Sequence, residues 1–386
     1  MIQGNKQIAI IGAGPGGLTL ARLLQRSGLT VKVYERDLDK DTRVQGSPLD
    51  MHEHSGWAAL VAAGLTESFK AHVRHGADRK VVVNAEGDVL FSDHAAKEEI
   101  GLAAGTNRPE IDRGMLRKLL LASLKTDTVS WNHHFLRMEP HGEGWLLYFK
   151  DRDAIYADLV IAADGANSKV RPYVTPIKPL YSGITMIEVN IAHGLRDTPK
   201  LRALLGGGKI MAIGKGKNIL GGQKEVDGLG FYVSLPLPAD WTKASGLDFY
   251  NREQVFTWFK QEYKGWSTIW DELFLHMVLP VIPRPIYYMP LDQFWSPRAN
   301  VTLLGDAAHV MPPFAGEGAN TAMYDALELC HYLTSNEYPN LQEAIGDYES
   351  SMRQRAAMAT KQCLENGELM HSDEALATML ARFEQN

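Results

Sequence analysis

Residues 8–36 read IAIIGAGPGGLTLARLLQRSGLTVKVYER, and this stretch decides the fold. Its first four residues form an apolar run, too short for a helix interior, that predicts a strand buried on both faces. Gly12, Gly14 and Gly17 follow with the G-x-G-x-x-G spacing. This spacing allows a tight turn, a close approach of backbone to a pyrophosphate, and close packing of helix on strand. The leucine-rich residues 18–24 then predict a helix whose amino end faces the phosphates.

The second half of the stretch completes a nucleotide-binding unit. Gly28 ends the predicted helix, and residues 31–34 predict a second strand. Glu35 follows about twenty residues after the loop, where a carboxylate accepts hydrogen bonds from ribose hydroxyls. The order of these elements predicts a dinucleotide site, against the alternatives of a structural glycine turn or a signal peptide. Pro15 and the four glycines beside it argue against the continuous apolar helix that a signal peptide needs.

Bulk composition narrows the class of protein. A chain of 386 residues is long enough for two packed units, and no apolar run approaches the roughly eighteen residues of a membrane span. The net charge of −6, with acids and bases interspersed, favours neither nucleic acid nor a membrane surface as partner. Two cysteines supply neither a disulfide framework nor a zinc site, and the histidines lack metal-ligand spacing. We expect a soluble, cytoplasmic, metal-free protein.

Two further motifs follow short apolar runs. Residues 159–162 predict a buried strand that ends at Asp164-Gly165, before an expected helix carrying Ser168 and Arg171. Residues 301–304 predict another strand, which ends at Gly305-Asp306. The Asp306 carboxylate is expected to accept a hydrogen bond from a ribityl or ribose hydroxyl.

The segment after Asp306 predicts a flavin-binding loop. Pro312-Pro313 forces a rigid turn, and Gly316 and Gly318 let the backbone approach a ring closely. A helix is expected to begin near Asn320, and its amino end would stabilise the negative charge of a reduced flavin.

The remaining segments predict a second domain and a helical end. Residues 181–280 contain strand-like runs, glycine-rich turns at 206–208 and 221–222, and a Trp-rich helical part at 249–270, which together predict an inserted sheet with a helix over it. Residues from 340 onward predict one long helix or two. Arg36 and Arg43 are candidate contacts for dinucleotide phosphates, although both could be solvated surface arginines.

Together these motifs resemble the single-component, class A FAD-dependent aromatic hydroxylases over nearly the whole chain. Within that group the chain looks most like the TetX-type tetracycline-modifying monooxygenases. The closest stretches are KVYERD (32–37), PEIDR (109–113), GDAAHVMPPFAGEG (305–318) and the terminal helix.

The resemblance implies an α/β fold with a Rossmann-type FAD-binding domain, an inserted β-sheet substrate domain and a long C-terminal helix. The implied FAD-binding domain covers 1–71, 101–175 and 291–335. The substrate domain covers 72–100 and 176–290, and 336–386 would bridge the two.

The resemblance also implies roles. Glu35 would bind the adenosine ribose, Arg36 and Arg113 the adenine or pyrophosphate, and Asp306 the pyrophosphate or ribityl chain. Asp164 would touch both FAD and NAD(P)H. The full set of expected cofactor contacts is Gly12, Gly14, Pro15, Gly17, Glu35, Arg36, Arg113, Asp164, Gly305, Asp306, Pro313, Gly316, Gly318, Ala319 and Asn320.

The implied reaction reduces non-covalent FAD with transiently bound NADPH and hydroxylates an aromatic or polycyclic phenol through a C4a-hydroperoxyflavin. No residue is assigned as catalytic, because the flavin carries the chemistry. A monomer that inactivates tetracycline, and so confers antibiotic resistance, is the leading expectation. An oxidase or dehydrogenase on the same scaffold, or a flavoprotein that sequesters a drug without turnover, remains an alternative.

The substrate residues depart from the TetX-type pattern. Glu188 and Lys209 stand where those enzymes use a glutamine and an arginine, and Gly230 stands at the position of a pocket histidine. Lysine lacks the bidentate fork of arginine, so the pocket would bind tetracycline differently or prefer another phenol. Glu188 and Lys209 could equally be surface charges. The other expected substrate contacts are Phe314, Ala315 and Gly316.

Overall fold

The structure, a computed structural model, describes residues 6–42, 48–74, 79–94, 108–224 and 227–384. The chain divides into two compact units. Unit 1 comprises Met1–Val73, Arg113–Leu180 and Tyr287–Cys363, and unit 2 comprises Arg74–Asp112, Tyr181–Ile286 and Leu364–Asn386. Within the described residues, no helix is both long and apolar enough to cross a membrane.

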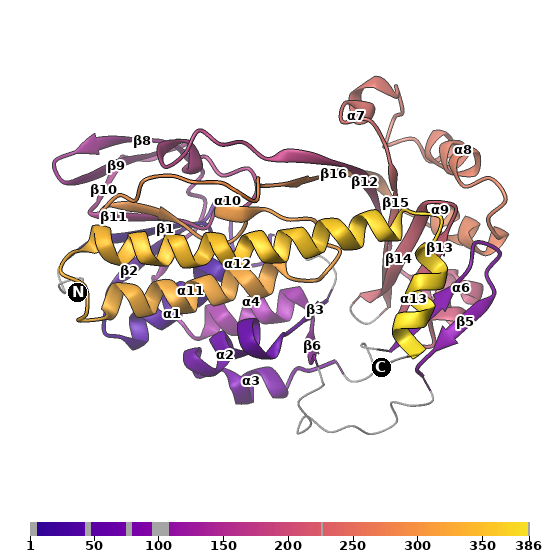
Figure 1. The fold of residues 1–386 in the computed structure, drawn as a ribbon, viewed down its shortest axis with the longest axis horizontal. Coiled ribbons are helices and arrows are strands. Elements are labelled where there is room, and N and C mark those ends of the chain that lie inside the picture. Colours follow the sequence, from indigo (N-terminus) through magenta and orange to yellow (C-terminus); the bar gives the residue numbers. More distant parts are fainter. Residues whose placement is uncertain (1–5, 43–47, 75–78, 95–107, 225–226, 385–386) are drawn as a thin grey trace. The chain divides into compact units, whose positions relative to one another are not determined.

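Unit 1 is built on a five-stranded parallel sheet (Figure 1). Its strand order is β17 (Val301–Leu303), β11 (Leu159–Ala162), β1 (Ile8–Ile11), β2 (Val31–Tyr34) and β7 (Val129–Ser130). The central strand β1 is buried throughout, as the short apolar run predicts, and Ile11 pairs with both Tyr34 and Ala162. Because all five strands run parallel, their carboxyl ends lie along one edge.

Layers on both faces cover this sheet. Helices α1 (Pro15–Arg26), α4 (Arg113–Ala122) and α11 (Gly318–Thr334) pack together on one face. The antiparallel strands β8 (Phe135–His141), β9 (Gly144–Phe149) and β10 (Ile155–Ala157) lie on the other (Figure 1). This arrangement is the predicted α/β fold, and α1 ends just before Gly28, which has a φ of +83°.

Shorter elements and one long helix complete unit 1. They are β3 (Leu49–Asp50), the π-helix η1 (Glu53–Trp57), α2 (Ala58–Ala63), α3 (Thr66–Lys70), the 3₁₀ helix η2 (Arg171–Tyr173) and α10 (Asp306–His309). Helix α12 (Leu341–Met370) begins in unit 1, which ends at Cys363. The predicted helix carrying Ser168 and Arg171 is wrong: Ser168 lies outside any helix, and Arg171 starts the three-residue η2. Pro172 disfavours the α conformation in the residue before it.

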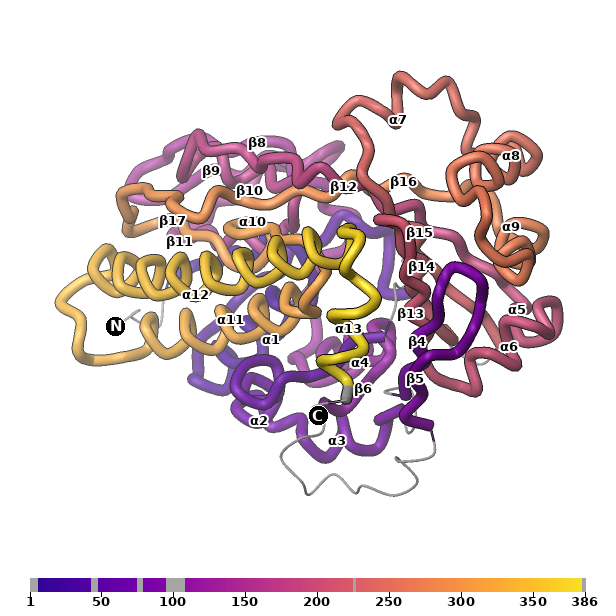
Figure 2. Tube along the Cα trace, turned by 45° about the vertical axis from the view of Figure 1, so that its right-hand side comes forward, coloured from indigo at the N-terminus to yellow at the C-terminus, as the bar shows by residue number. Residues whose placement is uncertain are grey.

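Unit 2 contains a seven-stranded sheet. Its order is β16 (Val278–Tyr288), β12 (Leu180–Ile191), β15 (Gly228–Pro236), β14 (Lys217–Lys224), β13 (Lys209–Gly214), β4 (Lys80–Val83) and β5 (Val89–Ser92). The other elements are β6 (Glu110–Ile111), α5 (Gly194–Asp197), α6 (Pro199–Leu205), α7 (Trp241–Ala244), α8 (Arg252–Glu262), η3 (Thr268–Trp270), α9 (Asp271–Leu275) and α13 (Ala375–Glu384). Figure 2 shows α8 and α9 on one side of this sheet and α13 on the other.

The two faces of the seven-stranded sheet differ in chemistry. Ile187 and Val189 alternate with Glu188 along β12, and the two apolar residues join a core with α6, α8 and α9. Glu188 therefore points to the opposite face. The predicted turn at 221–222 is wrong, because both glycines lie inside β14. A Cβ at Gly221 would lie 2.4 Å from the Gly230 carbonyl oxygen, so close packing explains the glycine there.

Candidate functional site

The carboxyl edge of the parallel sheet gathers the sequence motifs. Gly12, Glu35, Asp164 and Gly305 follow β1, β2, β11 and β17, which are four consecutive strands of the sheet. Backbone hydrogen bonds extend past the strands, from Gly12 N–H to Tyr34 O (2.9 Å) and from Leu304 N–H to Ala162 O (2.9 Å). Segments far apart in the chain thus meet at one edge, where open α/β sheets bind ligands.

The glycine loop is tight on its inner side and open on its outer side. A Cβ at Gly12, where φ is +106°, would lie 2.3 Å from Ala163 O, and a Cβ at Gly17 would lie 2.2 Å from Gly12 O. A Cβ at Gly14 would meet nothing within 4 Å, and no side chain caps α1 there. The open amino end of α1 therefore fits a pyrophosphate.

Glu35 anchors the same loop. Its carboxylate is buried, with Oε2 accepting from Ala13 N–H (2.7 Å) and Oε1 accepting from Asp37 N–H (3.0 Å). The side chain therefore stands at the end of β2 against the glycine loop, with its acceptors already oriented. Arg36 is exposed beside it. Arg113, at the start of α4, is partly buried, and Arg43 lies outside the described residues.

The second and third motifs are bonded to each other. Asp164 Oδ2 accepts from Lys169 N–H (2.8 Å), and Ser168 Oγ accepts from Arg171 N–H (2.9 Å). The buried Arg171 guanidinium donates from Nε to Ala307 O (2.6 Å) and from Nη2 to Asp306 O (2.8 Å). Sequence reasoning found both motifs but not this link, for which the sequence carries no signal.

Asp306 is the acceptor that the expected cofactor requires. Among the described residues its carboxylate forms no hydrogen bond or ion pair, and its side chain is solvent-accessible. Desolvation by the surrounding protein nevertheless raises the pKa of Asp306, against the opposing charges of His309, Arg113 and Arg171. Burial likewise raises the pKa of Asp164, whose Oδ1 has no hydrogen-bond partner among the described residues. The two carboxylates are acceptors that fit the hydroxyl groups of the FAD ribityl chain. The open glycine loop beside them fits the FAD pyrophosphate.

The loop before α11 is held by a network that sequence reasoning missed. Asn320, fully buried, accepts from His52 N–H (2.9 Å) and donates to Asp50 O (2.8 Å) and Gly316 O (3.2 Å). The His52 ring lies 3.2 Å from Asp50 Oδ2 and 3.2 Å from Glu317 Oε1. Burial opposes its charged form, but the two carboxylates outweigh burial and raise the pKa of His52 to about 9.

The expected flavin and substrate contacts of this loop differ in exposure. Pro313 and Gly316 are exposed, whereas Phe314, Ala315, Gly318 and Ala319 are partly buried. Gly316 has a φ of +71°, and a Cβ there would lie 3.3 Å from Asp50 Oδ1. The loop therefore presents backbone and small side chains, which allow a flat ring to come close.

Glu188 and Lys209 lie on one sheet of unit 2 but have separate partners. Glu188 is buried, so the alternative that it is a surface charge is wrong. The Arg284 guanidinium lies 2.6 Å from Glu188 Oε2, and Lys224 Nζ lies 3.4 Å from Glu188 Oε1. Burial is the largest single influence and raises the pKa of Glu188, but the contacts with Arg284, Asn190 and Lys224 together outweigh it, and the net shift is downward. Lys209 pairs with the buried Glu110.

Gly230 makes room for Lys224. A Cβ at Gly230 would lie 2.2 Å from Lys224 Cε, so the lysine chain crosses the backbone at this glycine. Its ammonium group then donates to Asn190 Oδ1 (2.5 Å). The position expected for a pocket histidine is thus filled by a cation from the neighbouring strand.

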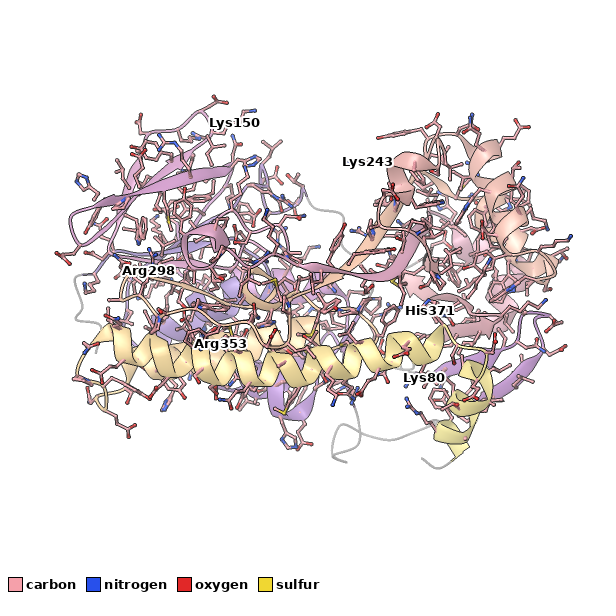
Figure 3. All side chains as sticks on the ribbon, turned by 45° about the horizontal axis from the view of Figure 1, so that its top comes forward. Lys80, Lys150, Lys243, Arg298, Arg353 and His371 are labelled. Carbon is pink, nitrogen blue, oxygen red and sulfur yellow. The ribbon has the colours of Figure 1, made fainter. Side chains whose placement is uncertain are left out.

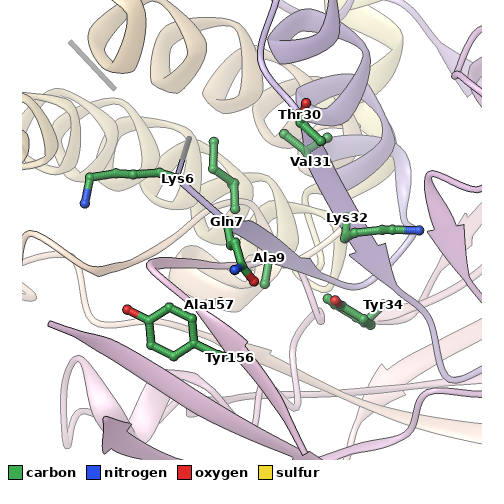
Figure 4. Close-up of a pocket in the computed structure, with 10 residues that line it drawn as sticks. Lys6, Gln7, Ala9, Thr30, Val31, Lys32, Tyr34, Tyr156 and Ala157 are labelled. Carbon is green, nitrogen blue, oxygen red and sulfur yellow. The ribbon is translucent and has the colours of Figure 1, made fainter. Parts of the chain in front are cut away.

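A separate pocket of about 190 Å³ opens at the other end of the parallel strands (Figure 4). Its lining includes Gln7, Thr30 and Tyr156, which precede or flank the amino ends of β1, β2 and β11. Because the motifs lie at the carboxyl ends, this pocket is not the candidate site.

The parallel sheet, the open glycine loop and the exposed Asp306 carboxylate define a dinucleotide-binding flavoprotein. Residues 5–206 and 296–362 match the family described as "FAD binding domain", and the chain belongs to that family. The chain is an FAD-dependent monooxygenase.

Three comparisons place the chain among its relatives. It is 28% identical to Monooxygenase penA of Penicillium thymicola, over 95% of this chain and 96% of that protein. It is 26% identical to the FAD-dependent urate hydroxylase of Klebsiella pneumoniae, over 95% of this chain and 92% of that protein. The crystal structure of tetracycline destructase Tet(55) superposes with a TM-score of 0.78 at 20% identity, covering 100% of this chain and 95% of that one, which shows a shared fold.

Proposed function

We propose that the enzyme uses NAD(P)H and O₂ to hydroxylate an aromatic or polycyclic phenolic compound. The observation that carries the proposal is the Asp306 carboxylate, which stands without a protein partner among the described residues and is bonded through its backbone to the Asp164 motif. The urate hydroxylase relative supports a ring compound as substrate.

The residues of unit 1 would hold FAD, which supplies oxygen activation when bound. Glu35 would accept from the adenosine ribose, and the α1 amino end would bind the pyrophosphate. Asp306 and Asp164 would accept from hydroxyl groups of the cofactor. Pro313–Gly318 would contact the ring, and the amino end of α11 would stabilise the negative charge that reduction adds.

A tetracycline-type compound is the proposed substrate. The shared fold with Tet(55) supports it, and the Glu188 cluster adds a specific expectation. Glu188, Lys224 and Arg284 together carry one net positive charge, so a substrate with an acidic phenol or enol is favoured over a cationic one.

The test is NADPH oxidation by the purified flavoprotein with and without tetracycline, with product mass followed in parallel. A substrate-stimulated rate and a gain of one oxygen atom are expected. Slow oxidation with peroxide release and unchanged drug would contradict tetracycline as substrate. A dehydrogenated product without a gain of oxygen would indicate an oxidase or dehydrogenase. Drug binding without NADPH consumption would indicate a sequestering protein.

A further inference from the structure

A second concave site in unit 1 lies beside the end of β2. This pocket of about 260 Å³ is lined by Arg36, Asn132, His134, Lys150, Asp151 and Arg152. Three separate segments supply these residues: the end of β2, the link between β7 and β8, and the turn between β9 and β10. Backbone bonds from Lys150 N–H to His134 O (2.9 Å) and from Asn132 N–H to Asp37 O (2.8 Å) fix the segments to one another.

The charges of this basic pocket are unbalanced. Among the described residues, the side chains of Arg36, Lys150 and Arg152 form no ion pair and no hydrogen bond. Lys169 adds a further cation, since its Nζ lies 3.2 Å from His134 Nε2. The one acid in the lining is Asp151. Cations that converge in a hollow without partners raise the local potential and attract an anion.

The positive potential of the pocket affects the pKa of His134. Desolvation lowers its pKa, and the charges of Lys169, Arg36 and Lys150 lower it further. These three cations and Lys150's neighbours Asp151 and Arg152 are the charged groups that face the ring from the surrounding segments. A bound anion would offset the cations and favour protonation of His134.

We propose that the basic pocket binds a phosphate dianion, and that its source is the 2′-phosphate of NADPH. Guanidinium groups bind phosphate through two parallel hydrogen bonds, and lysines add point charge. Arg36 directly follows Glu35, so the pocket lies beside the acid that is expected to hold the FAD ribose. FAD has no phosphate on its adenosine ribose, so the pocket suits a second dinucleotide.

This inference rests on the proposed NAD(P)H-dependent function and makes it specific for NADPH. Lys169 connects the pocket to the Asp164 motif, because its own N–H donates to Asp164 Oδ2 (2.8 Å). Asp164, which is expected to touch both dinucleotides, is thus linked to the basic pocket through the single residue Lys169.

The direct test is isothermal titration of the FAD-loaded enzyme with 2′,5′-ADP, 5′-AMP and inorganic phosphate in phosphate-free buffer. We expect 2′,5′-ADP to bind about tenfold or more tightly than 5′-AMP. Lys150→Gln and Arg152→Gln should each weaken the binding of 2′,5′-ADP about tenfold. Equal binding of the two nucleotides, with inorganic phosphate bound at the pocket, would overturn NADPH as the source.

Matched controls are Lys118→Gln on α4 and Arg298→Gln, which remove exposed cations that do not line the pocket. Figure 3 shows Lys150 and Arg298 well apart on unit 1. If the control variants weaken the binding of 2′,5′-ADP as much as the pocket variants do, the lost affinity reflects overall charge and the pocket assignment is wrong. The flavin absorbance of every variant shows whether FAD is retained.

Two readouts separate this inference from the proposed function. Pocket variants should raise KM for NADPH and leave kcat and the KM for NADH unchanged. An enzyme that oxidises neither nucleotide would refute the proposed function, and 2′,5′-ADP binding would then test the pocket by itself. Near pH 6.5, binding of 2′,5′-ADP should combine proton uptake at His134 with proton release from the phosphate. The net exchange is measured as a dependence of the binding heat on the buffer's ionisation enthalpy. His134→Gln should shift the net exchange toward release; an unchanged net exchange would contradict the assigned contact.

Discussion

The guanidinium of Arg171 binds the backbone at Asp306, with Nη2 2.8 Å from Asp306 O and Nε 2.6 Å from Ala307 O. The positive charge therefore holds the first turn of α10, and with it the direction of the Asp306 carboxylate. A single side chain couples two motifs that lie on different strands of the sheet.

Arg171→Lys should weaken FAD binding by about ten- to hundredfold. Lysine keeps the charge but cannot donate from two fixed nitrogens, and a lost hydrogen bond to a charged group costs about 1.5–3 kcal/mol. Quenching of flavin fluorescence on titration of apo-protein measures the dissociation constant. An affinity equal to that of the unmodified protein would show that α10 holds its position without the fork.

Asp306→Ala should lower FAD occupancy, since the acceptor for a cofactor hydroxyl is lost. Asp306→Asn should lower it less, because the amide retains one oxygen acceptor. The ratio of flavin to protein absorbance after purification gives the occupancy. Fully yellow Asp306→Ala protein would remove this residue from the FAD site.

His52 should make stability fall at alkaline pH. Its pKa is raised to about 9 in the folded protein, above the ordinary value of 6.5, so the contribution is fully present below about pH 6.5 and is lost as pH rises through about 9. Melting temperatures measured between pH 6 and 10 should decline for the unmodified protein. His52→Gln should begin lower and decline less; parallel curves for the two proteins would contradict an imidazolium between Asp50 and Glu317.

Glu349 should make stability fall between mildly acidic and neutral pH. Burial raises the pKa of this carboxyl group to about 7, against hydrogen bonds from Thr302 Oγ1 and Trp295 Nε1, both 2.8 Å long. The contribution of Glu349 to stability is greatest below about pH 4.5 and is lost as pH rises through about 7, by up to about 3 kcal/mol.

Denaturant unfolding at pH 5, 6 and 8 measures this loss. Glu349→Gln keeps a carbonyl acceptor and cannot ionise, so its free energy of unfolding should change less over the same range. An equally steep pH dependence in Glu349→Gln would assign the effect to other groups.

Local sequence patterns were sufficient for the strands, the glycine loop and α1 of unit 1. The apolar run 8–11 is buried as predicted, and Gly12 and Gly17 occupy positions where a Cβ would strike backbone. The same reasoning failed for 221–222, where two glycines lie inside β14 because a neighbouring strand packs closely against them. A glycine in a sequence indicates that a side chain does not fit at that position. It does not indicate whether a turn or a closely packed neighbouring strand is the reason.

The sequence by itself therefore determined the class of fold, the glycine loop and the acids that end the strands, because periodicity and local spacing act over a few residues. Only the tertiary structure decided the partners: Arg171 meets Asp306 across 135 residues, and Arg284 meets Glu188 across 96. The basic pocket likewise joins three segments. Electrostatic and hydrogen-bond energies depend on distance in space, and the order of strands in the sheet, which no local pattern contains, sets that distance.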